Sequence, residues 1–246
     1  MAFVFHPGFV FALACLGWAM LPALAQGTSD APAREFKLTP SAYVNDGGMR
    51  ATDVNLRWRQ GAHATWLGHY SNSDQFAQTR AGYEYAWQTQ WGQWVPSLQV
   101  ASMGFAGGSL NWQSPGTVFG LLGWGRTNGR DYYNLNFDPN DSVLIGGGFK
   151  WREQHVFNLL NVSDNRFDTG QSVTHANWRY SPRNHQSLVL DLAVKQGRPA
   201  ANEPEVRGQI VSLVFNHGPV FVHWAQDRKV NFSDDSQTRM ALGLRF

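Results

Sequence analysis

The amino-acid sequence predicts an all-β fold, a single up-and-down antiparallel β-barrel that spans a membrane. Three observations lead to this prediction. Apolar and polar residues alternate along many short segments, which is the period of a strand and not of a helix. Charged residues make up only 15% of the chain and aromatic residues 14%, whereas soluble domains carry about 25% charged residues. The mean hydropathy is still negative, at -0.36, as expected where alternate residues face a polar interior.

The clearest predicted strand is the end of the chain, residues 236–246. Its apolar face carries Thr238, Met240, Leu242, Leu244 and Phe246, and its other face carries Arg239, Ala241, Gly243 and Arg245. A chain that ends on the aromatic residue of such a strand resembles the Gram-negative outer-membrane barrels, whose last aromatic is part of the signal read by the barrel assembly machinery. The resemblance implies a protein of the outer membrane, surrounded by its lipids, with Phe246 contacting that machinery.

The start of the chain predicts export. Residues 9–24 form an almost unbroken apolar run, and Ala23-Leu24-Ala25 is typical of a signal-peptidase site, so residues 1–25 are predicted to be a signal peptide. The alternative is a single membrane anchor, because no Lys or Arg precedes the run. Residues 26–34 are rich in Ser, Pro, Ala and Asp, and we predict a flexible periplasmic lead.

The barrel is predicted over residues 35–246, in segments separated by turns of Gly, Pro, Asn and Asp. The expected strands are 35–44, 52–59, 63–70, 76–88, 94–102, 109–113, 117–126, 143–151, 155–162, 172–180, 187–195, 207–215, 220–227 and 236–246. This makes about fourteen strands. A second estimate gives about twelve, because one strand with its connection uses ~18 residues and the mature chain has ~220. Both numbers are even, which leaves both termini in the periplasm. Tyr132 to Phe137 is expected to extend a hairpin above the membrane.

Short turns alternate with longer polar loops along the chain, and aromatic residues bracket the short turns. The brackets are Trp58 and Trp66, Trp87 and Trp94, Trp112 and Phe119, Trp151 and Phe157, Tyr180 alone, and Phe215 and Phe221. An outer-membrane barrel has this alternation, and an aromatic girdle lies at its membrane interface. A soluble β-sandwich or lipocalin-like barrel in the periplasm is the alternative, but it needs neither so many outward Trp residues nor a terminal Phe.

With apolar residues facing outward, the lumen receives an excess of cations. The predicted lining residues are Arg57, Arg59, Arg80, Glu84, Lys150, Arg179, Asp191, Lys195, Arg239 and Arg245, together with Asp53 and Asp227. Such a lumen concentrates anions between low-dielectric walls. The prediction is a narrow passive channel for small hydrophilic, preferably anionic, solutes. The alternative is a structural barrel, in which inward cations and carboxylates pair and plug the lumen.

In length and architecture the chain resembles the small monomeric porins, such as the sialic acid and oligogalacturonate channels. One motif favours a different function. His69-Tyr70-Ser71-Asn72 resembles the active-site strand of outer-membrane phospholipase A and of lipid A deacylase, in which a His activates a Ser nucleophile. The resemblance implies a lipid hydrolase with His69 and Ser71, and Glu84 is then the candidate orienting group. The residue after the motif is Ser73, where the phospholipase pattern has Gly.

The face on which His69 and Ser71 lie decides this alternative. We expect Trp66 and Tyr70 to face the lipid, which turns His69 and Ser71 toward the lumen, away from any membrane substrate. A shift of one residue in the register would reverse every side chain of the strand.

The sequence predicts no metal or other cofactor. The histidines of the mature chain other than His69 show no close pair at ligand spacing, and the sole cysteine, Cys15, lies in the predicted signal peptide. No phosphate-binding loop, dinucleotide fingerprint or basic run indicates nucleotides or nucleic acid. The expected partners are therefore outer-membrane lipids, the assembly machinery and a small solute.

Overall fold

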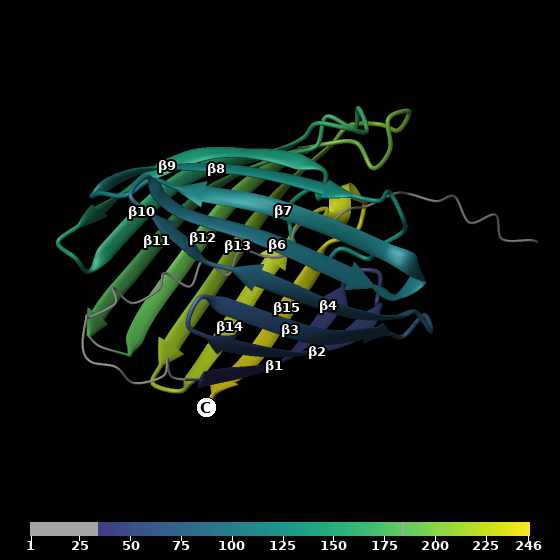
Figure 1. The fold of residues 1–246 in the computed structure, drawn as a ribbon. Helices are drawn as coiled ribbons and strands as arrows, with labels where there is room; N and C mark the ends of the chain where they lie inside the picture. The colour runs from purple at the N-terminus through teal and green to yellow at the C-terminus, as the bar shows by residue number, and fades with distance from the viewer. Residues whose placement is uncertain (1–33, 184) are drawn as a thin grey trace, which may run out of the picture.

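The structure is a computed structural model, and it describes residues 34–183 and 185–246 as one antiparallel sheet that closes on itself (Figure 1). The expected signal peptide and nearly all of the expected lead, residues 1–33, lie outside the described residues. Consecutive strands pair in order, β15 pairs with β1, and β4 pairs with β6. Because β4 and β5 are two pieces of one barrel strand that meet at Ala86, the fifteen segments make a closed barrel of 14 strands.

The strands follow one another without a helix longer than a single turn in the described chain. They are β1 Arg34–Asn45, β2 Arg50–Gln60, β3 His63–Asn72, β4 Ala77–Tyr85, β5 Trp87–Thr89, β6 Gly92–Ala101, β7 Phe105–Gln113, β8 Val118–Thr127, β9 Ser142–Trp151, β10 His155–Asp164, β11 Ser172–Arg183, β12 Gln186–Gly197, β13 Val206–His217, β14 Val220–Asp227 and β15 Gln237–Arg245. Two 3-10 turns, η1 Ser102–Gly104 and η2 Val230–Phe232, lie between strands. The predicted all-β up-and-down barrel with fourteen strands is therefore confirmed.

The outer surface of the barrel is apolar. Leu98, Ile145, Leu159 and Leu242 are 68%, 61%, 60% and 55% exposed, although they are large aliphatic residues in the middle of strands. Closure pairs the wall's backbone groups with one another, as a bilayer requires of any spanning segment. This is the surface of a barrel that lies in a membrane. Among the described residues, no helix is long and apolar enough to cross one.

The predicted facing of β3 is wrong. Trp66 and Tyr70 point into the barrel, where Tyr70 is fully buried, whereas Leu67 and His69 point outward. The inward set, with Ala64, Trp66 and Tyr70, is the more apolar face of β3, so its own alternation does not determine the facing. The neighbouring strand does: the Trp66 indole lies over Gly82 of β4, at a position where any Cβ would collide with the ring. His69 and Ser71 consequently lie on the outer face.

Three aromatics expected in the interfacial girdle also point inward. Trp66, Phe119 and Phe221 line the lumen, and the last two are 3% and 5% exposed. The partner residues of their brackets remain outside, where the Trp94 and Trp112 rings lie tilted to each other with 5.9 Å between their centroids. A girdle is thus present on the outer face, but with fewer residues than the sequence predicts.

Two further segments differ from expectation. β7 begins at Phe105, four residues earlier than expected, and includes Gly107 and Gly108, which precede the expected strand. Tyr132 to Phe137 forms no strand above the membrane: it belongs to the connection between β8 and β9, residues 128–141, which turns into the barrel. Tyr132 and Leu135 are 7% and 8% exposed there. We name residues 128–141 the inner loop. Its apolar side chains bury against the wall, which favours this position over an extended hairpin in water.

Inward aromatics lie over glycines of neighbouring strands, and Phe221 is the tightest case. Its ring occupies the volume where a Cβ on Gly243 would lie. We predict that Gly243→Ala forces Phe221 out of its position and lowers the free energy of unfolding by about 1–3 kcal/mol, as overpacking does. The measurement is the urea midpoint of refolded barrel in detergent micelles.

The matched control is Gly120→Ala, because a Cβ there meets no atom closer than 3.8 Å. A Gly243→Ala midpoint equal to that of Gly120→Ala would show that Phe221 does not depend on the glycine.

Candidate functional site

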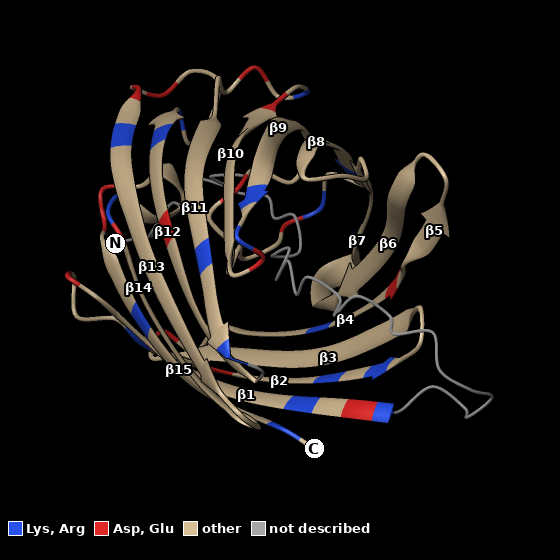
Figure 2. Cartoon of the chain, turned by 90° about the vertical axis from the view of Figure 1, so that its left-hand side faces the viewer, with Lys and Arg blue, Asp and Glu red and all other residues tan. Residues whose placement is uncertain are grey.

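A row of three cations crosses the inner wall at the end of the barrel that carries the short turns and the C-terminus. Lys37 of β1 lies directly opposite Arg245 of β15 and directly opposite Arg57 of β2. Figure 2 shows Lys and Arg on β1 and β2. Like charges that face each other across strands destabilise a sheet by about 0.2–1 kcal/mol per pair. We name Arg245, Lys37 and Arg57 the basic row.

The basic row has one acidic partner among the described residues. Arg57 forms an ion pair with Glu84 of β4, whereas neither Lys37 nor Arg245 lies within ion-pair distance of a described carboxylate. The Arg245 guanidinium donates a hydrogen bond of 2.7 Å to Asn216 Oδ1. These contacts hold the side chains in place and leave the positive charge largely uncompensated.

Phe221 forms an aromatic surface between two of these cations. Lys37 Nζ lies 4.3 Å from the ring centroid and Arg245 Cζ lies 5.1 Å from it. Cation–π contacts of this kind favour both cations over an apolar face. Neither Lys37 nor Phe221 is predicted from the sequence as a lining residue. In the structure the odd-numbered residues of β1, such as Tyr43, are buried on the inner face, and Lys37 shares their parity.

The other predicted lining residues also share the inward face of their strands, and several are paired. Arg80 Nη2 donates to both carboxylate oxygens of Asp53 at 2.9 Å, and both side chains are almost fully buried. Lys195 and Asp227 form a buried ion pair. Asp191 Oδ2 lies 2.9 Å from His175 Nδ1. These groups compensate one another within the wall.

Three of the four remaining predicted residues, Arg59, Arg179 and Lys150, lie at the same end of the barrel as the basic row. Arg59 faces Glu35 across β1 and β2. Arg239 Cζ lies 5.2 Å from the Tyr43 ring centroid. Arg179 of β11 lies within electrostatic range of Arg245, and Lys150 shares the inward parity of β9. Arg59, Arg179 and Lys150 thus lie in the half of the lumen near the short turns, whereas Arg239 lies opposite Tyr43 in the half that holds the inner loop.

The other half of the lumen holds the inner loop, which Gln78 of β4 fixes to the wall. The Gln78 side-chain amide donates to the Tyr133 carbonyl at 3.1 Å and accepts from the Tyr133 N–H at 2.8 Å. The Tyr133 ring stacks on Tyr70 with a centroid distance of 4.7 Å. Because Gln78 is fully buried, these two bonds satisfy polar groups that would otherwise be unpaired inside the barrel.

Contacts from other strands hold the inner loop at further points. Tyr132 stacks on Phe105 of β7 with a centroid distance of 4.2 Å. Asp138 Oδ1 lies 2.9 Å from His175 Nε2 of β11. Phe137 packs against a cluster that includes Phe232 of the turn η2. The loop is therefore attached to opposite sides of the barrel and narrows the lumen. Its polar anchors are not apparent in the sequence, because each joins residues far apart in the chain.

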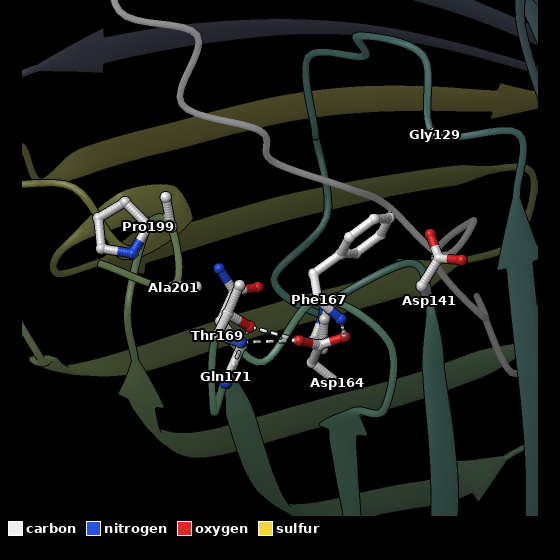
Figure 3. Close-up of a pocket in the computed structure, with 10 residues that line it drawn as sticks. Gly129, Asp141, Asp164, Phe167, Thr169, Gln171, Pro199 and Ala201 are labelled. Atoms are coloured by element: carbon white, nitrogen blue, oxygen red, sulfur yellow. Dashed lines mark hydrogen bonds between the residues drawn. The ribbon is translucent and has the colours of Figure 1, made fainter. Parts of the chain in front are cut away.

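A cavity of about 260 Å³ opens among the loops outside this constriction (Figure 3). Phe167 and Asp164 line it on one side, and Pro199 lies across from them. Thr169 Oγ1 donates to Asp164 Oδ2 at 2.5 Å, which fixes the loop after β10. The cavity belongs to the mouth of the barrel, at the end opposite the basic row.

The residues of the hydrolase motif do not assemble a catalytic site. His69 Nδ1 contacts Thr79 Oγ1 at 2.9 Å and Ser71 Oγ contacts Thr52 Oγ1 at 3.3 Å. Among the hydrogen bonds of the described residues, none joins His69 to Ser71. Glu84 points to the lumen and pairs with Arg57, on the opposite side of the sheet from His69. The geometry therefore does not support the lipid-hydrolase interpretation.

A closed barrel with an apolar outer face, a charged lumen and an infolded loop has the fold of the porin-type outer-membrane barrels. Omp33 of Acinetobacter baumannii has a similar fold, with a TM-score of 0.53 and 8% identity over 88% of this chain and 100% of that one. A mutant of Rh. blastica porin has a TM-score of 0.49 and 8% identity, and the match covers 87% of this chain and 99% of that one. The NanC porin has a TM-score of 0.48 and 8% identity, and the match covers 84% of this chain and 98% of that one. No family model and no curated protein matches the chain.

We predict that Gln78→Leu releases the inner loop, because the Tyr133 backbone loses both hydrogen bonds to the wall. The expected result is a larger or more strongly fluctuating single-channel conductance in planar bilayers. Gln99→Leu is the matched control, since Gln99 is also a buried inward Gln but has no hydrogen bond to the loop among the described contacts. Equal conductance in both variants would argue against Gln78 as the anchor.

Proposed function

We propose that this outer-membrane barrel is a narrow passive channel for small hydrophilic solutes, with a preference for anions. The observation that carries the proposal is the basic row, in which Lys37 stands between Arg245 and Arg57 on the inner wall. A row of like charges lowers stability, so its presence is better explained by a solute than by the fold. An anion that passes the row offsets the mutual repulsion of its members.

The proposed lining extends beyond the row to the other inward charges. Within it, Arg57, Arg59, Arg179, Arg239 and Arg245 act on the solute, together with Lys37 and Lys150. Arg80 and Lys195 form buried pairs with Asp53 and Asp227, and their role is to shape the wall. A structural barrel with a plugged lumen would need carboxylates to match its cations. Lys37 and Arg245 lack such partners among the described residues, which favours the channel.

Removal of two cations from the row tests the preference for anions. We expect the Lys37→Gln and Arg245→Gln double variant to retain channel activity and to lose most of its selectivity for chloride over potassium, because selectivity follows the charge that lines the pathway. The measurement is the reversal potential in planar bilayers under a KCl gradient.

The matched control removes a cation outside the lumen. Arg207 is exposed and pairs with Glu205 near the mouth, so Arg207→Gln should leave the reversal potential unchanged. Cation selectivity in the wild type, or a reversal potential that the double variant does not move, would contradict the proposal. Absence of any channel events would contradict the channel itself.

We also infer that Phe246 is read by the barrel assembly machinery. Its backbone exchanges two hydrogen bonds with Phe36, at 2.7 and 2.9 Å, and its ring stacks on Phe36 with a centroid distance of 5.7 Å. The side chain is nevertheless 65% exposed. A terminal aromatic that is fixed in an extended strand and open on one side is accessible to a protein partner in the periplasm.

We predict that Phe246→Ala lowers the amount of folded barrel in the outer membrane several-fold, while the purified variant refolds in detergent like the wild type. Trp91→Ala is the control, because Trp91 is a 70% exposed aromatic in a turn. The amount of folded barrel of each variant is measured in membrane fractions by its heat-modifiable migration on a gel. If the two variants assemble equally well, recognition of Phe246 is not required.

A further inference from the structure

We propose that the preferred solutes of the channel are small dianions, which carry two negative charges within a short span. This inference rests on the proposed channel function and narrows its substrate class. The evidence is a pair of neighbouring cations in the basic row, Lys37 and Arg245, which lie beside one aromatic ring and form no ion pair within the described chain. We name these two residues the cation pair.

The two charges of the cation pair lie close enough for one small solute to reach both. Lys37 and Arg245 are directly opposite each other on β1 and β15, where the Cβ atoms of paired residues are about 4.5–5.5 Å apart. Lys37 Nζ lies 4.3 Å from the centroid of the Phe221 ring, and Arg245 Cζ lies 5.1 Å from the same centroid. Because both charged groups are beside one ring, a solute of a few carbon atoms can contact both.

The cation pair differs from other inward cations in having no carboxylate bound to it. Three other cations of the lumen form ion pairs, which are Arg57 with Glu84, Arg80 with Asp53, and Lys195 with Asp227. Among the described residues, no carboxylate lies within ion-pair distance of Lys37 or Arg245. The wall therefore holds two adjacent positive charges without an ion pair. A monoanion would neutralise one of them, whereas a dianion matches their number.

The cation pair is held in place and is still partly exposed to the lumen. The Arg245 guanidinium donates a hydrogen bond of 2.7 Å to Asn216 Oδ1, and Asn216 Nδ2 donates to Ser187 Oγ at 3.0 Å. An arginine has five N–H donors, so this contact leaves donors for a solute. Lys37 and Arg245 are both partly exposed rather than buried. Cations that are already positioned lose little conformational entropy when an anion binds, which favours affinity.

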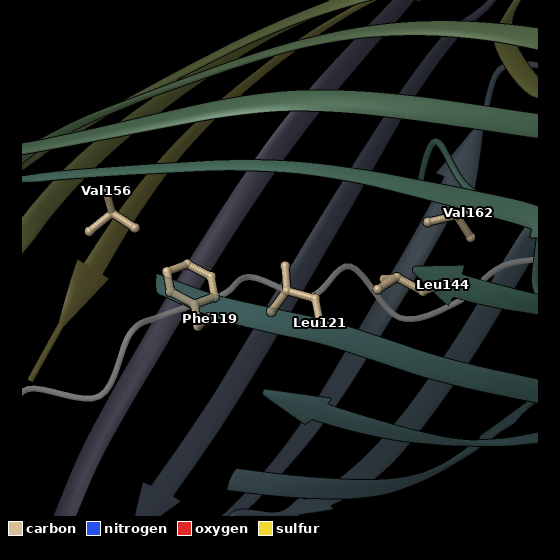
Figure 4. Close-up of a cluster of buried hydrophobic side chains, with 5 residues drawn as sticks. All are labelled: Phe119, Leu121, Leu144, Val156 and Val162. Carbon is tan, nitrogen blue, oxygen red and sulfur yellow. The ribbon is translucent and has the colours of Figure 1, made fainter. Parts of the chain in front are cut away.

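The wall across the lumen from the cation pair is largely uncharged. In the closed ring of 14 strands, with β4 and β5 counted as one, β9 is seven strands from β1 in either direction. On β8, β9 and β10 lies a buried cluster of Phe119, Leu121, Leu144, Val156 and Val162 (Figure 4). These side chains are covered by their neighbours and give a solute no charged contact. Recognition of charge is therefore concentrated on the side of β1 and β15.

The test compares the block of chloride current in planar bilayers by succinate and by succinamate at neutral pH. The two solutes have the same carbon chain, but succinamate has an amide in place of one carboxylate and therefore carries one negative charge. We expect the half-block concentration of succinate to be lower by about tenfold, as one further charge-assisted hydrogen bond would give. Equal half-block concentrations for the two solutes would overturn the proposal.

Sulfate distinguishes two kinds of dianion, because it carries both charges on one centre. Block by sulfate at a lower concentration than succinamate would support the proposal with a single dianionic group as the ligand. Preferential block by succinate alone would support it with two separate anionic groups.

Variants of Lys37 assign the preference to the cation pair. Lys37→Gln leaves one of the two charges, so succinate should lose most of its advantage over succinamate, whereas Lys37→Arg keeps the charge and should keep the advantage. Arg245→Gln provides the same test if Lys37→Gln does not refold. The matched control is Arg179→Gln, because Arg179 is another inward cation within electrostatic range of Arg245, and it should reduce the advantage less. Equal losses in Lys37→Gln and Arg179→Gln would indicate general attraction by the lumen and would overturn the proposal.

Failure of the channel and failure of this inference give different results. If no chloride current appears, the proposed function fails, and calorimetric titration of detergent-solubilised protein with succinate and with succinamate still tests the cation pair. Equal affinities for the two solutes would then overturn the inference. If an anion-selective current appears and the two solutes block it equally, the channel stands and the preference for dianions is wrong.

Discussion

The pairing of β4 with β6 is the contact on which the rest of the structure depends, because it closes the sheet. A closed sheet has no edge, so its backbone groups find partners within the wall and the outer face can be entirely apolar. Closure also divides the side chains of every strand into a lipid set and a lumen set. Lys37, Arg57 and Arg245 then have to lie inside, where they are brought together from the two ends of the chain.

The interior of the barrel is organised by a second requirement, which is the satisfaction of polar groups away from bulk water. Gln78 satisfies the polar groups of the Tyr133 backbone in the inner loop through two hydrogen bonds. Asp138 of the same loop pairs with His175 of β11 across the lumen. The loop half of the lumen is consequently filled with compensated charges and stacked rings. The half near the short turns keeps an excess of cations, so the two halves of the lumen differ in charge.

The two sides of the ring differ in character. Lys37, Arg57 and Arg245 place like charges on one side, and this row is the basis of the proposed preference for anions. On the other side Phe119, Leu121 and their neighbours are buried and pack against one another.

Alternation along single strands predicted the barrel and the facing of β2, β12 and β15, because one face of each is clearly apolar, as Met240 and Leu242 illustrate. It favoured fourteen strands but left twelve open, and the pairing of the strands shows fourteen. The facing of β3 could not be predicted in this way. Its more apolar set, which includes Trp66 and Tyr70, points inward, and the choice depends on the space that Gly82 leaves for Trp66. The inward course of the inner loop was likewise beyond the sequence, since Tyr133 is held by Gln78, 55 residues away.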